Sequence, residues 1–227
     1  GGSLSDEDNE LTSDWGEYRP QTKVAVFNYN VHLVSPAPPQ QARTTLLTDT
    51  LYYNTVTSVA NARGPSTIDD GGCHIYTEMG YVNSKNNNLT LLNRSEMSNN
   101  GKKLIGDSIV WNSVDSIGEA FGNVFYSDML NNNAMTGNYC YYNDRMGYTL
   151  GTDSACILDY SQGADTMYMH GDSIKMFTYN INTDSVYRTM HAYNHVRMYR
   201  SDMQGVCDSL VYLTSDSMMI MYNDPIV

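Results

Sequence analysis

Two histidines, His191 and His195, have the H-x3-H spacing that often serves a metal ion. On a helix this spacing places both imidazoles on one face, where they can bind one zinc ion. On a β-strand four residues rise about 13 Å, which is too far for two ligands of one metal. Residues 191–199 have the pattern of a strand. We therefore expect neither a metal site nor a cofactor here.

Four acidic residues, Asp49, Asp107, Asp172 and Asp208, occupy one equivalent position of a sequence repeat. A glycosidase needs two carboxylates that converge to within about 5–10 Å. Acids that recur once per repeat fit a role at the start of a strand or in a turn instead. We favour that structural role and assign no catalytic residue. The alternative is that the protein is an enzyme built as a β-stack that acts on polysaccharide.

The repeat extends over almost the whole chain, in steps of 29 to 36 residues. Its copies share an acidic or amide residue, alternating apolar residues and, in the best cases, a final Asn. They lie at 49–54, 107–112 and 138–143, with looser copies at 14–19, 78–83, 172–180 and 208–212. A unit of about 30 residues cannot bury its own apolar face, so neighbouring units must stack to make a core.

Each copy predicts short strands joined by a hairpin turn. Leu51 and Tyr53 alternate with polar residues, which is the pattern of a strand with one buried face. Segments rich in Asn, Asp, Ser and Thr follow and predict turns. They span residues 54–58, 112–116, 143–147 and 180–184. The Pro-rich segment 35–39 predicts an exposed loop, and no segment has a helical apolar period. The predicted fold class is an all-β, elongated stack with little or no helix.

The composition narrows the function further. A net charge of −12 with only 13 Lys plus Arg argues against nucleic acid as a partner. The acidic segment 1–12 is interpreted as an N-terminal tail or a cloning remnant, and 13–227 as a single repeat domain. No signal peptide is visible. The four cysteines, Cys73, Cys140, Cys156 and Cys207, lack CxxC spacing, and the sequence leaves open whether they are paired.

Several motifs resemble the organic-solvent-tolerance-A-like (OstA-like) family. Gly-Asp-x-Ile/Leu-x-Tyr/Trp-Asn alternates with Gly-Asn-Val in that family, and the pattern occurs at 106–112, 122–124 and 171–174. The segments 137–143 and 176–187 are similar to the branch found in Bacteroidetes-type bacteria. The resemblance covers about residues 14–223. The family includes the periplasmic bridge protein of lipopolysaccharide transport.

The resemblance implies a half-open β-jellyroll, a folded sheet with an apolar groove in which lipid acyl chains lie. It implies a non-enzymatic periplasmic scaffold that carries lipopolysaccharide or a similar amphiphile toward the outer membrane. It also implies head-to-tail association with further copies, or with other bridge proteins of the same fold. The residues expected to line the groove are Leu51, Tyr53, Ile109, Trp111, Val124, Tyr142 and Ile174.

The same apolar residues could instead fill a closed sandwich core. Period-two alternation shows which side chains share a face, but not whether that face meets protein or lipid. A filled interior would favour a surface adhesin or another structural repeat. The family resemblance favours the groove.

Overall fold

The computed structural model describes residues 2–5, 10–35, 44–70, 72–83, 85–86, 88–112, 114–143, 145–161, 163, 165–181, 183–216 and 218–227. Within these ranges the regular structure is all β, in sixteen strands without a helix, which confirms the predicted fold class. The strands are β1 (Gly2–Ser5), β2 (Glu10–Ser13), β3 (Trp15–Arg19), β4 (Val24–Ser35), β5 (Thr44–Asn54), β6 (Val59–Asp70), β7 (Cys73–Asn83), β8 (Asn88–Asn99), β9 (Lys102–Asn112), β10 (Ile117–Asp128), β11 (Asn133–Asn143), β12 (Tyr148–Asp159), β13 (Met167–Tyr179), β14 (Tyr187–Arg200), β15 (Met203–Leu213) and β16 (Met218–Tyr222).

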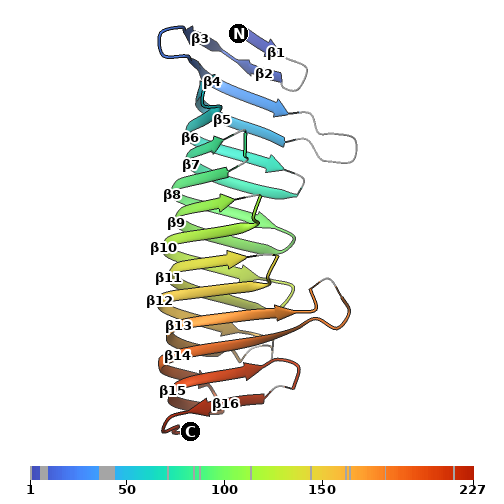
Figure 1. Cartoon of the computed structure of the whole chain (residues 1–227), viewed down its shortest axis with the longest axis vertical. Coiled ribbons are helices and arrows are strands. Elements are labelled where there is room, and N and C mark those ends of the chain that lie inside the picture. Colours follow the sequence, from blue (N-terminus) through green and yellow to red (C-terminus); the bar gives the residue numbers. More distant parts are fainter. Residues whose placement is uncertain are drawn as a thin grey trace. The chain divides into compact units, whose positions relative to one another are not determined.

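The chain divides into two compact units, which share β9. The first unit comprises residues 1–100 and 107–114, and the second comprises residues 101–106 and 115–227. In the first unit the hydrogen-bonded strand order is β1-β2-β4-β5-β6-β7-β8, with β3 paired to β4. In the second unit β10 to β16 follow chain order (Figure 1). The described pairs are antiparallel, and the sheet is not closed, because β1 has only β2 beside it and β16 only β15.

The Asn that ends several repeat copies accepts hydrogen bonds within the following turn. The Oδ1 atom of Asn54 accepts hydrogen bonds from the backbone N–H groups of Val56 at 2.9 Å and Thr57 at 3.0 Å. Asn83 and Asn143 use their side-chain oxygens in the same way. Asn suits these turns because its short side-chain amide replaces a backbone acceptor there. The predicted turns are confirmed, since each lies between two consecutive strands.

Every second strand from β4 to β14 has an extra residue near its middle. In β12 the register shifts between Thr152 and Ala155, and the two intervening residues face a single residue of β13. Those two residues, Asp153 and Ser154, have φ angles of 56° and 67°. Such β-bulges bend a strand and increase its twist. Equivalent positive-φ residues are Tyr29 and Asn30, Gly64, Asn93 and Arg94, Gly122 and Asn123, and Asn194 and His195.

Within each unit the long strands bend near the bulges, so each contributes one half to each of two layers (Figure 1). We call the interior line along the bend the crease. Its side chains are small and buried, which suits the place where one layer turns into the other. The crease residues are Thr48, Ser66, Thr77 and Ser95 in the first unit, and Ala155, Gly171 and Val196 in the second.

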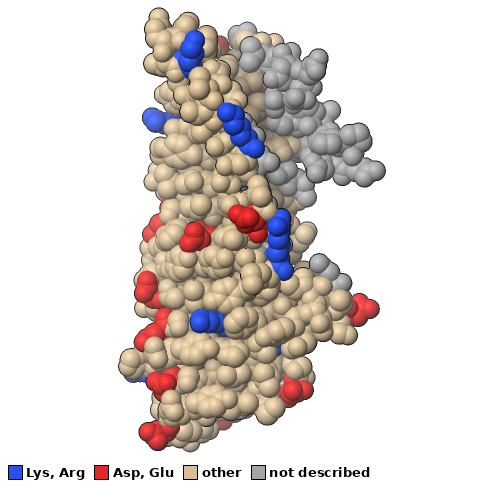
Figure 2. Space-filling model, viewed as in Figure 1, with Lys and Arg blue, Asp and Glu red and all other residues tan. Residues whose placement is uncertain are grey.

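The recurring acids are exposed in the middle of their strands, next to the bulges. Asp107 lies 3.2 Å from the guanidinium of Arg94, and Asp172 lies 3.0 Å from Nδ1 of His195. In the second unit, acidic side chains line the margin where the strands bend (Figure 2). The prediction that these acids start strands or lie in turns is therefore wrong. Each strand begins several residues earlier, because the apolar alternation continues on both sides of the bend.

The described parts of the N-terminal segment 1–12 pair with each other, while the acidic residues 6–9 lie outside the described residues. Residues Gly2–Ser5 form β1 and pair with β2, and Leu11 of β2 is buried. Leu11 belongs to an apolar cluster with Leu46 and Leu51, which explains why this segment is held in the sheet. The Pro-rich segment after Ser35 lies outside the described residues. The four cysteines do not form disulfides with one another.

Candidate functional site

The two layers of the second unit face each other through apolar side chains. Tyr126, Met135 and Ile157 come from the layer that contains the second half of β10 and β12. Ile174 and Met176 come from the opposite layer. Between them lies a small, partly open space. We call it the apolar cleft, and it is lined by Tyr126, Asn133, Ala134, Met135, Thr149, Ile157, Ile174, Met176 and Met190.

Register explains how this lining arises. One row of paired residues crosses β11 to β15 close to the bend and is buried: Cys140, Gly151, Ile174, Ala192 and Leu210. The row two residues nearer the turns is larger: Tyr142, Thr149, Met176, Met190 and Tyr212. Glycine in the first row lets the layers approach. A Cβ atom added to Gly151 would lie 2.7 Å from Sδ of Met135 in the opposite layer.

The seven residues predicted to line a groove fall into two classes of exposure. Four are at most 3% exposed: Leu51, Ile109, Val124 and Ile174. The other three, Tyr53, Trp111 and Tyr142, are half-buried. The three half-buried residues lie near the ends of their strands, beside the turns.

The structure brings only one of these residues, Ile174, into the lining of the apolar cleft. Leu51 packs in the core of the first unit with Val31 and Ala62. Ile109 and Trp111 also belong to the first unit, on the second part of β9. The contact of these seven residues with a lipid stays a prediction.

Sequence reasoning missed most of the cleft lining. Met135, Met176 and Met190 contribute three of its side chains. The available signal was the high methionine content, 14 residues in the chain. Methionine is unbranched and polarizable, so it adapts to ligands of different shape. A Met placed in register with the buried face of a strand was therefore a usable marker.

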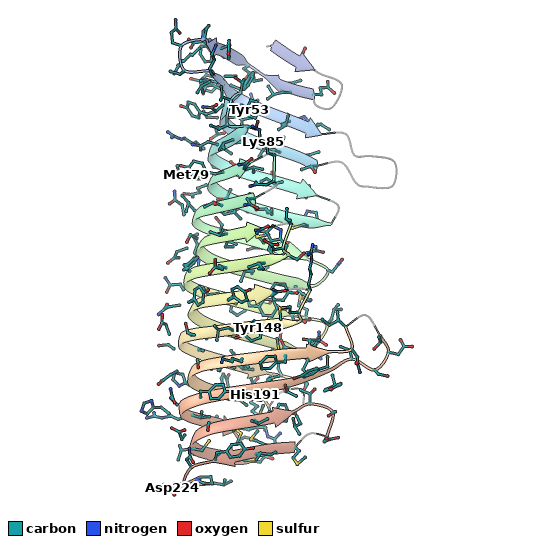
Figure 3. All side chains as sticks on the ribbon, in the orientation of Figure 1. Tyr53, Met79, Lys85, Tyr148, His191 and Asp224 are labelled. Atoms are coloured by element: carbon teal, nitrogen blue, oxygen red, sulfur yellow. The ribbon has the colours of Figure 1, made fainter. Side chains whose placement is uncertain are left out.

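The layer that contains Ile174 and Met176 has a row of aromatic rings on its outer face. The ring of Tyr148 lies 5.9 Å from that of Tyr141 and 5.2 Å from that of Phe177. Phe177 contacts His191 at 5.4 Å, edge to face. Figure 3 shows Tyr148 and His191 on the strands turned toward the viewer. Cross-strand aromatic pairs of this kind stabilise a sheet.

Two ionisable groups on this part of the sheet have shifted pKa values. Burial raises the pKa of Tyr139, and the hydrogen bond from its hydroxyl to Glu119, 2.6 Å long, raises that pKa further. Burial lowers the pKa of His191, and the nearby charge of Lys175 lowers it further. These shifts disfavour charge on the outer face, which is consistent with a packed surface.

The two histidines of the H-x3-H motif have different surroundings. His191 stacks with Tyr193 at 6.3 Å between ring centroids, on the half of β14 that precedes the bulge. His195 lies in the bulge itself and contacts Asp172. Within the described ranges, no group of three or more His, Cys, Asp or Glu residues could hold a metal ion. The described part of the chain also has no helix that is long and apolar enough to cross a membrane.

Comparison with known proteins finds a match to a family model and similarity to solved structures. Residues 1–38 match the family model of OstA-like proteins. The chain is also similar to LptH, described as the LptA homologous periplasmic component of the conserved lipopolysaccharide transport device from Pseudomonas aeruginosa. That similarity has 17% sequence identity and a TM-score of 0.44, and it covers 50% of this chain and 82% of the LptH chain. No curated protein sequence matches.

The family match falls on a part of the chain that precedes the motifs quoted above. It includes the four strands β1 to β4, whereas the Gly-Asp and Gly-Asn-Val motifs lie in β9, β10 and β13. The resemblance to the OstA-like family, first stated from those motifs, is thereby confirmed over residues 1–38.

Proposed function

We propose that this chain is a non-enzymatic lipid carrier of the periplasm, which binds acyl chains of lipopolysaccharide or a similar amphiphile between its layers. The observation that carries the proposal is the apolar lining of the cleft in the second unit, which is partly open. The OstA-like match over residues 1–38 supports it at the family level. Transport toward the outer membrane follows from the same family resemblance.

The lining of the apolar cleft suits a hydrocarbon chain. Apart from Asn133 and Thr149, its side chains are apolar or aromatic. Each buried CH₂ group contributes about 0.8 kcal/mol, so six of them contribute about 5 kcal/mol before the cost of association. The methionines can change rotamer to widen the cleft as a chain enters. Binding of this kind requires no charged contact.

The acids argue against a polysaccharide-active enzyme. Each recurs beside its own bulge, and Asp107 and Asp172 are engaged by Arg94 and His195. Carboxylates spread one per repeat do not form the convergent pair that glycoside hydrolysis needs. Their contacts instead hold the bend that separates the two layers.

Open sheet edges support association with other copies. β1 and β16 have one neighbouring strand each, and unpaired edges readily add further strands. Head-to-tail association would extend the groove from one copy to the next. Bridge proteins of the same fold could join in the same way.

A charge placed in the apolar cleft tests the proposal. Met176→Asp should weaken binding of fluorescently labelled lipopolysaccharide at least about tenfold, because a carboxylate in an apolar site is costly. The matched control is Tyr168→Asp, which adds the same charge to an exposed position of β13. Circular dichroism establishes that both variants fold. If folded Met176→Asp binds as tightly as the parent, or the parent does not bind, the proposal fails.

A further inference from the structure

A cationic side chain lies at the margin of the apolar cleft. Arg188 is two residues before Met190 on β14, so the two side chains share a face. On the opposite layer Asp128 is two residues after Tyr126 on β10. Met190 and Tyr126 both line the cleft. Arg188 and Asp128 therefore lie one step beyond the lining, on the side nearest the turns.

A polar contact connects these two layers. Nη1 of Arg188 donates a hydrogen bond of 2.9 Å to Oδ1 of Asn131, in the turn between β10 and β11. Asn131 in turn donates to both carboxylate oxygens of Asp128, from its backbone N–H at 3.1 Å and from Nδ2 at 2.6 Å. The guanidinium of Arg188 is thus connected to the opposite layer by a hydrogen bond to a neutral amide oxygen, that of Asn131.

The charge of Arg188 has no carboxylate partner within ion-pair distance among the described residues. Its backbone is fixed by Thr214, whose hydroxyl accepts from the Arg188 N–H at 3.0 Å and donates to the Arg188 carbonyl at 2.9 Å. Asp128 is 4% exposed and already accepts two hydrogen bonds from Asn131. A half-buried guanidinium, on a residue whose backbone is held by Thr214, is left beside an apolar space.

We infer that Arg188 anchors the anionic headgroup of an amphiphile whose hydrocarbon chain lies in the apolar cleft. The inference rests on the proposed function and names the ligand chemistry of its site, a phosphate or carboxylate joined to an alkyl chain. A guanidinium binds such groups through two parallel N–H···O bonds, which are stronger than one bond to an amide oxygen. The anion replaces Asn131 as the partner of Arg188, while Asn131 keeps its bonds to Asp128.

The local charge of Arg188, in contrast to the net charge of the chain, suits an anionic headgroup. The chain has a net charge of −12, so its average field repels anions. An anionic amphiphile therefore needs a specific cation at its place of binding, and Arg188 provides one within reach of the cleft. Arg188 and Met190 lie two residues apart on one face of β14. A ligand with its headgroup at Arg188 and its hydrocarbon chain at Met190 therefore binds in one orientation.

Two soluble amphiphiles with the same chain test the inference by calorimetry. Decyl phosphate and decyl maltoside are titrated below their micellar concentrations, and inorganic phosphate is titrated alone. Arg188→Gln should weaken decyl phosphate binding about tenfold and leave decyl maltoside unchanged. Arg197→Gln, which removes the same charge from an exposed position of β14, should change neither. Arg188→Lys keeps the positive charge but cannot make the two parallel N–H···O bonds of a guanidinium. Its affinity for decyl phosphate should therefore fall less than that of Arg188→Gln.

The outcomes separate the two proposals. If the parent binds both amphiphiles and Arg188→Gln binds decyl phosphate as tightly as the parent, the headgroup role is overturned while the lipid carrier stands. If Arg188→Gln fails to fold, an unchanged affinity of Arg188→Lys for decyl phosphate overturns it equally. If inorganic phosphate binds as tightly as decyl phosphate, the site takes a free anion and the inference is wrong. If the parent binds neither amphiphile, the proposed function fails as well.

Discussion

The crease of the first unit contains a buried pair of hydroxyl groups whose removal should destabilise the fold. Thr77 and Ser95 are 0% exposed, and their hydroxyl oxygens are 2.8 Å apart. The Thr77 hydroxyl also lies 2.9 Å from the carbonyl oxygen of Met79 and 3.1 Å from that of Leu92. Met79 and Leu92 are paired at one end of the register shift between β7 and β8, where the sheet ladder is interrupted. The hydroxyl therefore replaces backbone partners that the bulge removes.

Thr77→Val keeps the shape of the side chain and removes only the polar group. A buried acceptor left without a partner costs about 1–3 kcal/mol. Unfolding in urea has a slope of about 2 kcal/mol per M for a chain of this kind, so a loss of about 2 kcal/mol lowers the midpoint by about 1 M. The double variant Thr77→Val/Ser95→Ala should cost less than the sum of the two single changes, because the pair shares one interaction.

Tryptophan fluorescence is the natural assay, since both tryptophans of the chain, Trp15 and Trp111, belong to the first unit. The signal then reports the unit that contains Thr77. Thr67→Val is the matched control, because Thr67 is exposed on the adjacent strand β6 and should tolerate the change within about 0.5 kcal/mol. Equal midpoints for Thr77→Val and Thr67→Val would refute the role assigned to the crease hydroxyl.

Two further predictions concern the ionisable groups of the second unit. Burial raises the pKa of the Cys140 thiol from 9.0 to about 12, so the thiolate fraction at pH 8 falls from about one in ten to about one in 10,000. Iodoacetamide should leave Cys140 unmodified until the chain is unfolded in urea, as read by peptide mass spectrometry; rapid labelling of the folded chain would contradict this. The pKa of His191 is lowered from 6.5 by burial and then by Lys175, so the unfolded chain binds the proton more readily and stability should fall as pH drops below 6.5. His191→Gln should reduce the difference in urea midpoint between pH 7.5 and pH 5.5, whereas His170→Gln, at an exposed position of β13, should not; an unchanged difference in His191→Gln would show that another group governs it.

The turns and the buried faces of strands can be predicted from the sequence because they depend on residues that are close together in the chain. The Asn that ends a repeat copy acts on backbone groups two and three residues away, as Asn54 does. The alternation of Leu51 with Tyr53 depends only on the two-residue period of a strand. Both features can be read without knowledge of the rest of the chain.

The bend and the cleft margin were harder to predict because they depend on pairing between strands. Asp49 is placed beside a bulge in the neighbouring strand, which no feature of its own segment shows. The contact of Arg188 with Asn131 joins residues 57 positions apart. It requires that two layers fold over each other, and the period of one strand does not contain that information.

The gradient of side-chain size across each layer indicates where a hydrocarbon chain can enter. At the crease the interior residues are as small as Ala155, and the layers touch where Gly151 meets Met135. Two residues nearer the turns the row contains Tyr142 and Met176, which are half-buried, between positions such as Met190 that are buried. The interior is therefore a wedge that is filled at the bend and looser at its open side.

This shape determines which of the residues predicted to contact lipid have surface available for that contact. Ile109 and Ile174 are 1% exposed, so their energy is already used in holding the layers together. Tyr53, Trp111 and Tyr142 retain exposed surface at the ends of their strands, where a ligand can bury it without unpacking the core. We therefore expect lipid contacts at the aromatic residues of the open side, with the aliphatic residues of the bend acting as the scaffold that holds them.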